Sequence, residues 1–246
     1  MTAVVGKLFA ALDCIAAEGN DAVGLAQLTQ RTRLPKATLY RLLCDLVDAG
    51  VVEHSKNGYS LGGRLFELGF AVPRYRRLRQ QAMPFLEDLQ AEIGETVHLG
   101  VLMDEKVVIL EKLFGRSQVR VPTTVGSRHA LYSTAMGKIL LAHSMPDVIH
   151  RILGSLEPVT RRTVIAPGLL SRQLGRFRHE GVALEAEETY AGIGCVAAPL
   201  TGPDGAIAAI SVAGNPRKVH TSAVQNRVRQ VACRLSLSLD AGLAAS

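Results

Sequence analysis

Aromatic side chains are scarce in this sequence of 246 residues: they make up 4% of it, and tryptophan is absent. Hydrophobic residues still account for 48%, so we expect sizeable cores built from aliphatic side chains. The length lies between the usual sizes of one and two domains. Apolar runs long enough to span a membrane are lacking, and no early segment resembles a signal peptide. We therefore expect a cytoplasmic protein with no membrane partner.

Cysteines are few and widely spaced. Cys14, Cys44, Cys195 and Cys233 include no Cys-x-x-Cys pair. This spacing argues for reduced thiols and against a disulfide framework or a structural zinc site. The sequence therefore predicts no metal site and no bound cofactor.

The net charge of +6 is unevenly distributed. Residues 1–62 carry six basic and six acidic side chains, whereas residues 63–80 carry five basic and one acidic. The five arginines of residues 63–80, called here the middle arginines, have two interpretations. They either strengthen contact with a nucleic-acid backbone or form a helix face that pairs with carboxylates elsewhere, and we favour the second alternative. They are Arg64, Arg74, Arg76, Arg77 and Arg79.

The stretch from Gly24 to Leu61 is the most informative part of the chain. A short helical pattern over Leu25–Gln30 leads through a tight connection, residues 31–34, to a second helix that opens at Pro35. Apolar residues spaced three and four apart lie on one face of this second helix: Leu39, Leu42, Leu43, Leu46 and Val47.

Gly50 ends the second helix, and two short strand-like runs follow. They cover Val51–His54 and Gly58–Leu61 and flank a turn at Lys56-Asn57-Gly58. Helix, turn, helix and a two-stranded wing are the layout of a winged DNA-binding domain.

The outward face of the second helix carries side chains suited to the major groove. Arg31 and Arg33, in the expected turn, suit phosphates better than bases, and Lys56 of the wing suits the backbone or the minor groove. Folds that bind no nucleic acid also contain such helix pairs, and each side chain could simply be solvated. The basic residues around the turn favour double-stranded DNA as a partner. The candidates on the second helix are Lys36, Ala37, Thr38, Tyr40 and Arg41.

A hinge is expected after the wing. We assign residues 1–62 to the winged domain, residues 63–80 to a linker helix and residues 81–246 to a second domain. Pro73 should interrupt the linker helix, because proline lacks an N–H and clashes with the preceding turn. Pro84 suits the first turn of a following helix.

From Thr96 onward the periodicity becomes that of short strands. TVHLGVLM and KVVILEKLF indicate a hairpin joined at Asp104-Glu105. Further strands are expected over residues 119–122, 181–185, 194–199 and 206–213. Helices are expected over residues 135–143, 147–153, 169–179 and 220–243. An antiparallel sheet flanked by helices makes this an α+β domain.

Five stretches, in order along the chain, resemble the IclR family of bacterial transcription regulators: LPKATLYRLLCDLVDAGVVE, GETVHLGVL, YSTAMGKILLA, EAEETYAGIGCVAAPL and AISVAG. The resemblance implies an α+β fold with an N-terminal winged helix-turn-helix, a linker helix and a C-terminal GAF-like, effector-binding domain. It implies a homodimer formed through the DNA-binding part, often paired into a homotetramer. It also implies that a small carboxylic or aromatic acid switches DNA binding.

The resemblance further implies a set of effector-binding positions. Glu185 stands where aspartate is usual, Ala213 removes a hydroxyl, and His129 and Ala130 replace a common aliphatic residue and proline. These departures affect the identity of the effector and not the fold. The implied positions are His129, Ala135, Met136, Gly137, Glu185, Cys195, Ser211 and Ala213.

The chemistry of these residues leaves alternatives open. If Ser133 or Thr134 caps the helix that follows, the amides of Ala135, Met136 and Gly137 form an anion site; otherwise they are simply a well-capped helix start. Ser211 on its strand is either a hydroxyl donor to a ligand or a structural residue.

Glu185 has three alternatives. It is protonated beside a ligand carboxylate, it accepts a hydrogen bond from a ligand hydroxyl or N–H, or it belongs to a solvated acidic loop with Glu187 and Glu188. A flat molecule with an acceptor at one end and a donor at the other would suit the second alternative.

Two other functions are alternatives to a regulator. Cys195 with His98 or His129 has the composition of a nucleophile and base, or of a redox or metal sensor. The apolar strand GCVAAPL is, however, an ordinary environment for an inert buried cysteine. We therefore favour a regulator without enzymatic activity, most simply a repressor of a catabolic operon.

Overall fold

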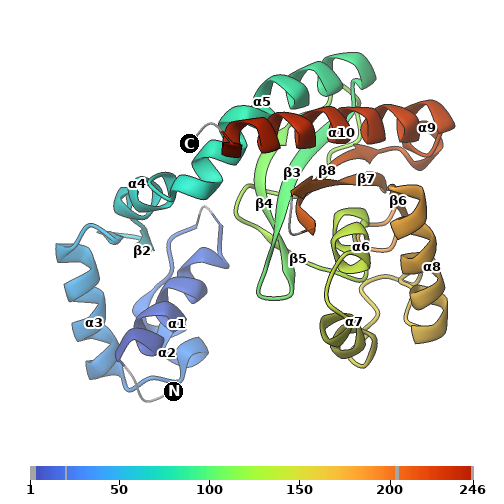
Figure 1. Cartoon of the computed structure of the whole chain (residues 1–246). Helices are drawn as coiled ribbons and strands as arrows, with labels where there is room; N and C mark the ends of the chain where they lie inside the picture. Colours follow the sequence, from blue (N-terminus) through green and yellow to red (C-terminus); the bar gives the residue numbers. More distant parts are fainter. Residues whose placement is uncertain (1–3, 20, 203–204, 245–246) are drawn as a thin grey trace. The chain divides into compact units, whose positions relative to one another are not determined.

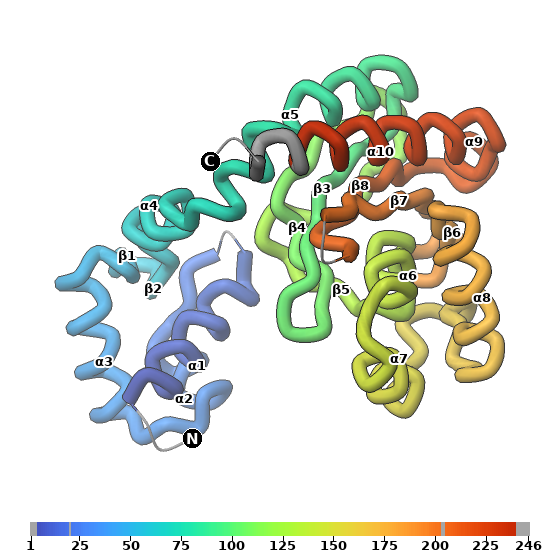
Figure 2. The backbone as a smooth tube through the Cα atoms, in the orientation of Figure 1, coloured from blue at the N-terminus to red at the C-terminus, as the bar shows by residue number. Residues whose placement is uncertain are grey.

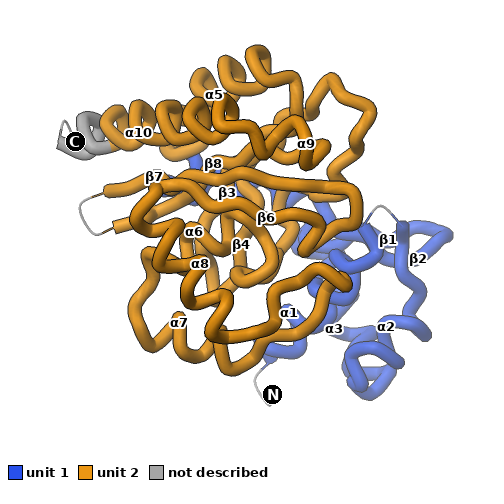
Figure 3. The backbone as a smooth tube through the Cα atoms, turned by 90° about the vertical axis from the view of Figure 1, so that its right-hand side faces the viewer, with its two compact units in different colours: residues 1–76 blue, residues 77–246 orange. Residues whose placement is uncertain are grey.

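The computed structural model describes residues 4–19, 21–202 and 205–244 and divides into two compact units (Figures 1 and 3). Unit 1 is Met1–Arg76 and unit 2 is Arg77–Ser246. The division falls inside the segment expected to be a linker.

Unit 1 has the helix-turn-helix and wing expected from the sequence. Its β1 and β2 form an antiparallel hairpin in which Val52 pairs with Leu61. One expectation was wrong: α2 extends to Thr32, so Arg31 lies in the helix and not in the turn. The elements are α1 (Val4–Ala16), α2 (Leu25–Thr32), α3 (Lys36–Asp48), β1 (Val52–Ser55), β2 (Gly58–Leu61) and α4 (Gly63–Phe70).

A small, mainly aliphatic core holds unit 1 together. The apolar face of α3 contributes Leu39, Leu43 and Leu46, and they pack with residues of α1, α2 and the wing. The turn between α2 and α3 is closed by Arg33, which adopts a left-handed conformation with φ 56° and donates its N–H to the Thr29 carbonyl.

Backbone hydrogen bonds fasten the wing to the chain before α2. The amide of Val23 donates to the carbonyl of Tyr59 at 2.8 Å, and the amide of Tyr59 donates back at 2.9 Å. A Cβ on Gly58 would lie 2.6 Å from the Val23 carbonyl oxygen, so only glycine allows this approach.

The helix α5 (Pro73–Ile93) is continuous; it begins in the last residues of unit 1 and continues into unit 2. Pro73 separates it from α4, as expected. The expectation for Pro84 was wrong, because this proline lies inside α5 and not at the start of a new helix. Tertiary packing accounts for the difference: the helix buries a stripe of side chains on both sides of Pro84, and their burial offsets the missing hydrogen bond. The stripe is Leu78, Ala82, Leu86 and Leu89.

Unit 2 is built on a six-stranded sheet in the order β5-β4-β3-β8-β7-β6, with every neighbouring pair antiparallel. The pairing of β3 with β8 brings distant parts of the sequence side by side (Figure 2). The strands are β3 (Thr96–Met103), β4 (Lys106–Leu113), β5 (Arg128–Ala130), β6 (Ala183–Ala186), β7 (Gly194–Gly202) and β8 (Gly205–Gly214).

The strand expected over residues 119–122 is wrong, because this segment is irregular. A side chain bonds the Val121 carbonyl and the Thr123 carbonyl just after the segment. The ammonium of Lys112 donates to the Val121 carbonyl at 2.7 Å and to the Thr123 carbonyl at 2.6 Å.

Helices cover both faces of this sheet: α5 and α10 lie on one face, and α6 and α8 lie on the other (Figure 1). Strand residues alternate between the faces, so Cys195 and Ala213 face α6 while Val196 and Val212 face the opposite side. The helices are α6 (Ala135–Ala142), α7 (Pro146–Leu153), α8 (Pro167–Glu180), α9 (Pro216–Val219) and α10 (Ser222–Ala244). Among the described residues, no helix has the length and apolar character to cross a membrane.

Candidate functional site

The residues expected to contact DNA lie on the outer face and at the start of α3. Their neighbours on the inner face, such as Leu39 and Leu43, are fully buried. Tyr40 is 54% exposed, an unusual position for a large aromatic side chain in a chain with so few. Lys36, Ala37, Tyr40 and Arg41 are exposed and Thr38 is half-buried.

The three other basic candidates are also exposed. Arg31, at the end of α2, is paired with the carboxylate of Glu18. Arg33 lies in the turn and Lys56 at the tip of the wing. Among the middle arginines, Arg64 pairs with Glu67 and Arg79 with Glu111, in line with the favoured alternative for that cluster.

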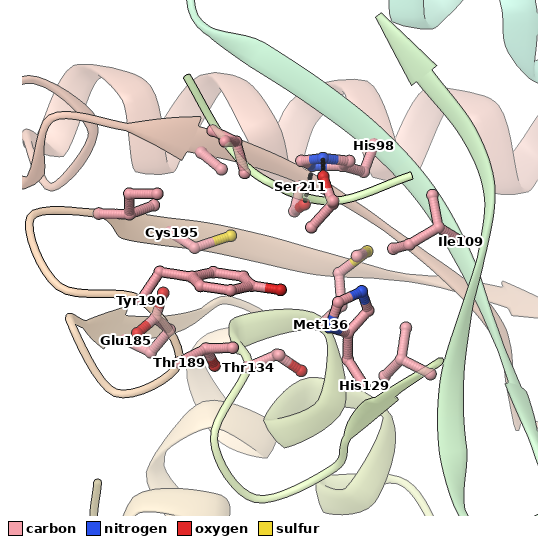
Figure 4. Close-up of a pocket in the computed structure, with 15 residues that line it drawn as sticks. His98, Ile109, His129, Thr134, Met136, Glu185, Thr189, Tyr190, Cys195 and Ser211 are labelled. Atoms are coloured by element: carbon pink, nitrogen blue, oxygen red, sulfur yellow. Dashed lines mark hydrogen bonds between the residues drawn. The ribbon is translucent and has the colours of Figure 1, made fainter. Parts of the chain in front are cut away.

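A cavity of about 40 Å³ lies in unit 2, on the face of the sheet that α6 covers (Figure 4). It is bounded by side chains from β3, β4, β5, β6, β7 and β8, by the start of α6 and by irregular segments. Ala135 and Gly137 do not line it. Six of the eight positions implied for an effector do: His129, Met136, Glu185, Cys195, Ser211 and Ala213.

The start of α6 points its first turn at this cavity through Thr134 and Met136. Thr134, and not Ser133, caps the helix: its hydroxyl accepts the N–H of Gly137 at 3.0 Å and donates to the Ala130 carbonyl at 3.0 Å. The amide of Gly137 is thereby already bonded, which leaves those of Ala135 and Met136 as the donors of the first turn.

Glu185 is a buried carboxyl group on β6, opposite Cys195 of β7 in the strand register. Its Oε2 accepts the backbone N–H of Glu188 at 2.9 Å. Burial raises the pKa of Glu185 to about 8, since desolvation disfavours the charged form. The raised pKa favours the first alternative for Glu185, a carboxyl group that is mainly protonated at neutral pH. The burial of Glu185 excludes the alternative of a solvated loop.

The sequence pointed to His98 only as a partner of Cys195, whereas the structure places it in the lining of the cavity. It lies on β3 opposite Ser211 of β8 and is 2% exposed. Its Nε2 is 2.8 Å from Thr123 Oγ1 and its Nδ1 is 3.4 Å from Ser211 Oγ. Burial, with smaller contributions from Lys112 and His129, lowers the pKa of His98 to about 3, so the ring is neutral. One sequence feature could have indicated that His98 faces a cavity: it is a polar residue in the middle of the apolar strand TVHLGVLM.

The polar groups of the cavity gather on two opposite sides. Figure 4 shows His98 and Ser211 on one side and Glu185 and Thr189 on the other, with the hydroxyl of Tyr190 directed between them. Thr189 and Tyr190 were also missed, because a polar loop residue carries no local sign of facing a cavity.

Cys195 lacks the surroundings of a reactive thiol. It is buried, and burial raises the pKa of its thiol well above the usual range. Cys195 is therefore not an activated nucleophile. Within the described residues, no group of three or more His, Cys, Asp and Glu side chains could hold a metal ion.

Two family models match the chain. The model described as "Bacterial transcriptional regulator IclR C-terminal" matches residues 71–237, and the "IclR helix-turn-helix domain" matches residues 4–56. Together they match residues in both units.

Individual relatives agree with these matches. The HTH-type transcriptional regulator BhcR of Paracoccus denitrificans is 33% identical over 236 residues, which are 93% of this chain and 84% of that protein. The glycerol operon regulatory protein of Streptomyces griseus is 31% identical over 241 residues, 95% of each chain. The crystal structure of an IclR homolog from Microbacterium hydrocarbonoxydans, complexed with 4-hydroxybenzoate, superposes with a TM-score of 0.88 at 26% identity. It covers 96% of this chain and 99% of that chain.

Proposed function

The chain belongs to the IclR family of bacterial transcriptional regulators, and we propose that a small molecule bound in the cavity of unit 2 switches its affinity for an operator. As a member of this family it is a DNA-binding regulator and not an enzyme. We assign residues 1–62 to DNA binding, residues 63–80 to the linker and residues 81–246 to effector binding.

The observation that carries this proposal is convergence on one cavity. Met136 at the start of α6, Glu185 on β6, Cys195 on β7 and Ser211 on β8 come from separate elements and line the same space. Enclosed spaces that combine apolar walls with a few placed polar groups are the usual form of small-molecule sites.

The lining favours a small carboxylic or aromatic acid. The first-turn amides of α6 suit an anionic or carbonyl group, beside a protonated Glu185. On the other side, His98 and Ser211 suit a hydroxyl group. The cavity of about 40 Å³ is below the roughly 150 Å³ that holds a benzene ring, so the effector should be small, and the lining side chains must move apart to admit an aromatic acid. The complex of the Microbacterium homolog with 4-hydroxybenzoate supports a hydroxylated aromatic acid.

On the DNA side, we assign base and groove contacts to α3 and phosphate contacts to the residues around it. Arg31, Arg33 and Lys56 hold the backbone. A homodimer would place two copies of α3 on a pseudo-palindromic operator, and pairing of dimers would give a homotetramer. The groove residues are Lys36, Ala37, Thr38, Tyr40 and Arg41.

We assign the sign of regulation as repression of a catabolic operon. A nutrient that weakens operator binding would switch on its own degradation, which needs no further component. The relative named as a glycerol operon regulatory protein supports control of an operon.

Calorimetry with 4-hydroxybenzoate, followed by gel shifts on DNA selected by the protein from a random library, tests the proposal. Met136→Trp should fill the cavity and abolish binding of the acid and its effect on DNA affinity. Met145→Trp is the matched control, because Met145 is 73% exposed on the surface. Equal binding by both variants would place the ligand elsewhere.

A further inference from the structure

A buried ion pair lies next to the cavity without lining it. Lys138, on α6, is fully buried, and its ammonium group contacts the carboxylate of Glu188, which is 5% exposed. The same ammonium lies 3.1 Å from Gln173 Oε1 on α8. Placing two charges in the interior is costly, and removal of either partner leaves the other uncompensated.

The pair holds the segment that follows β6. Glu188 accepts the Val164 amide on its Oε2 at 3.1 Å, and its backbone carbonyl accepts the Thr163 hydroxyl at 2.8 Å. The next residue, Thr189, donates its hydroxyl to the Ser133 carbonyl at 2.9 Å. This segment is therefore fastened to α6, to α8 through Lys138, and to the chain before α8.

Both ends of the pair lead directly to cavity residues. Glu188 donates its amide to Glu185 Oε2 at 2.9 Å, and Thr189 and Tyr190 follow it in the cavity wall. Lys138 lies on the same helix as Met136, one turn after the cap residue Thr134. The pair thus connects two walls of the cavity from behind.

We propose that Lys138 and Glu188 are positioning residues of the effector site, which fix the orientation of the Glu185 carboxyl and set its charge without touching the effector. The part that concerns the effector rests on the proposed function; the part that concerns Glu185 does not.

The two charges act on Glu185 in opposite directions. The Glu188 carboxylate raises the pKa of Glu185 further above the value that burial gives, whereas the Lys138 ammonium lowers it. Other groups around Glu185 come from each neighbouring element. They are Glu187 and Tyr190 on its own segment, Cys195 on β7 and His220 after α9, whose Nε2 lies 2.9 Å from the Glu185 carbonyl oxygen; Arg176 on α8 acts on Lys138.

Titration of the glutamate carboxyl carbons by NMR in ligand-free protein tests the assignment, with Glu185→Gln used to identify the Glu185 signal. Glu188→Gln keeps the acceptor for the Val164 amide and removes the charge. Its Glu185 midpoint should fall by about one pH unit or more, since Lys138 is then left with Glu185 as its counter-ion. In Lys138→Met/Glu188→Gln, which leaves no buried charge of the pair unpartnered, the midpoint should rise again.

This ordered shift, down in the single variant and up in the double variant, is not expected of a pair that only stabilises the fold. A shared Glu185 midpoint in wild type and both variants, with all three folded by circular dichroism, would overturn the assignment. The assignment would also be overturned if the Glu185 midpoint fell at both steps, or rose at both steps, from wild type to Glu188→Gln and from Glu188→Gln to the double variant.

Calorimetry with 4-hydroxybenzoate across neutral and alkaline pH completes the test. The pH midpoint of its affinity should follow the Glu185 midpoint in all three proteins. Binding with no such correspondence would overturn the positioning role. Absence of any binding, with the ordered NMR shift intact, would overturn the proposed effector and support the assignment of Glu185.

Discussion

Gly137 and Leu131 approach each other along their backbones: a Cβ on Gly137 would lie 2.5 Å from the Leu131 carbonyl oxygen and 2.6 Å from its Cα. Only glycine permits this contact. Because the chain before α6 lies directly against the first turn of the helix, Thr134 can cap it and Met136 can reach the cavity. Gly137, implied as an effector residue by the family resemblance, thus serves the site by shaping α6.

Gly137→Ala should therefore destabilise the protein by about 1–3 kcal/mol, the usual range for overpacking a tight interior. The matched control is Gly175→Ala in α8, where a Cβ meets nothing within 4 Å. That change should stabilise by roughly 0.5–1 kcal/mol, because alanine favours the helix. Urea denaturation measures both, and equal shifts in the two variants would contradict the close contact.

Arg41→Ala should weaken specific operator binding by about 1–3 kcal/mol if the guanidinium reads a base in the major groove. The control is Arg172→Ala, which removes the same charge from an exposed position on α8. Gel shifts with specific and unrelated DNA measure the effect. An Arg41→Ala protein that binds its operator like the Arg172→Ala protein would remove Arg41 from the reading surface.

His98 should make the protein sensitive to acid. The unfolded chain gains a proton on this ring near the ordinary pKa of 6.5, whereas the folded chain gains it only at about pH 3. The contribution of the neutral His98 ring to the free energy of unfolding is thus fully present above about pH 6.5. It is lost as the pH falls toward 3, by up to ~1.4 kcal/mol per pH unit.

Replacing the ring should flatten that dependence. In acid, the free energy of unfolding of His98→Gln should depend on pH less steeply than that of wild type, by the equivalent of about one proton. His150→Gln, an exposed control on α7, should keep the wild-type slope. Denaturant melts between neutral and acid pH give both slopes. If the slope of His98→Gln matches that of wild type, His98 does not hold the buried neutral state described.

Cys195 should resist alkylation in the native protein. Its thiol is buried and protonated, whereas Cys233 is exposed on α10. Iodoacetamide followed by peptide mass spectrometry should show rapid labelling at Cys233 and labelling at Cys195 only after denaturation. Fast native labelling at Cys195 would revive the redox-sensor alternative.

Unit 1 shows how far local patterns reach. The apolar spacing of α3, its start after Pro35 and the Gly58 turn of the wing are short-range signals, and each matches the structure. The error at Arg31 concerns a helix end, where one or two residues depend on how the following turn closes.

Unit 2 shows where local patterns stop. Most of its helices and strands follow from periodicity, but residues 119–122 and Pro84 do not. Lys112 bonds the carbonyl groups of Val121 and Thr123, and side-chain burial maintains the helix through Pro84. Both effects come from residues that the local pattern does not contain.

Short-range patterns in the chain were thus enough to predict most of the elements, the α+β class and the resemblance to the family. The chemistry of the cavity needed the folded arrangement, because it arises from residues far apart in the sequence. His98 meets Ser211, and Lys138 meets Glu188, only after β3 pairs with β8 and α6 packs beneath β6 and β7. Burial among those elements leaves His98 neutral and raises the pKa of Glu185 to about 8, since a charge loses its hydration only when the surrounding structure is complete.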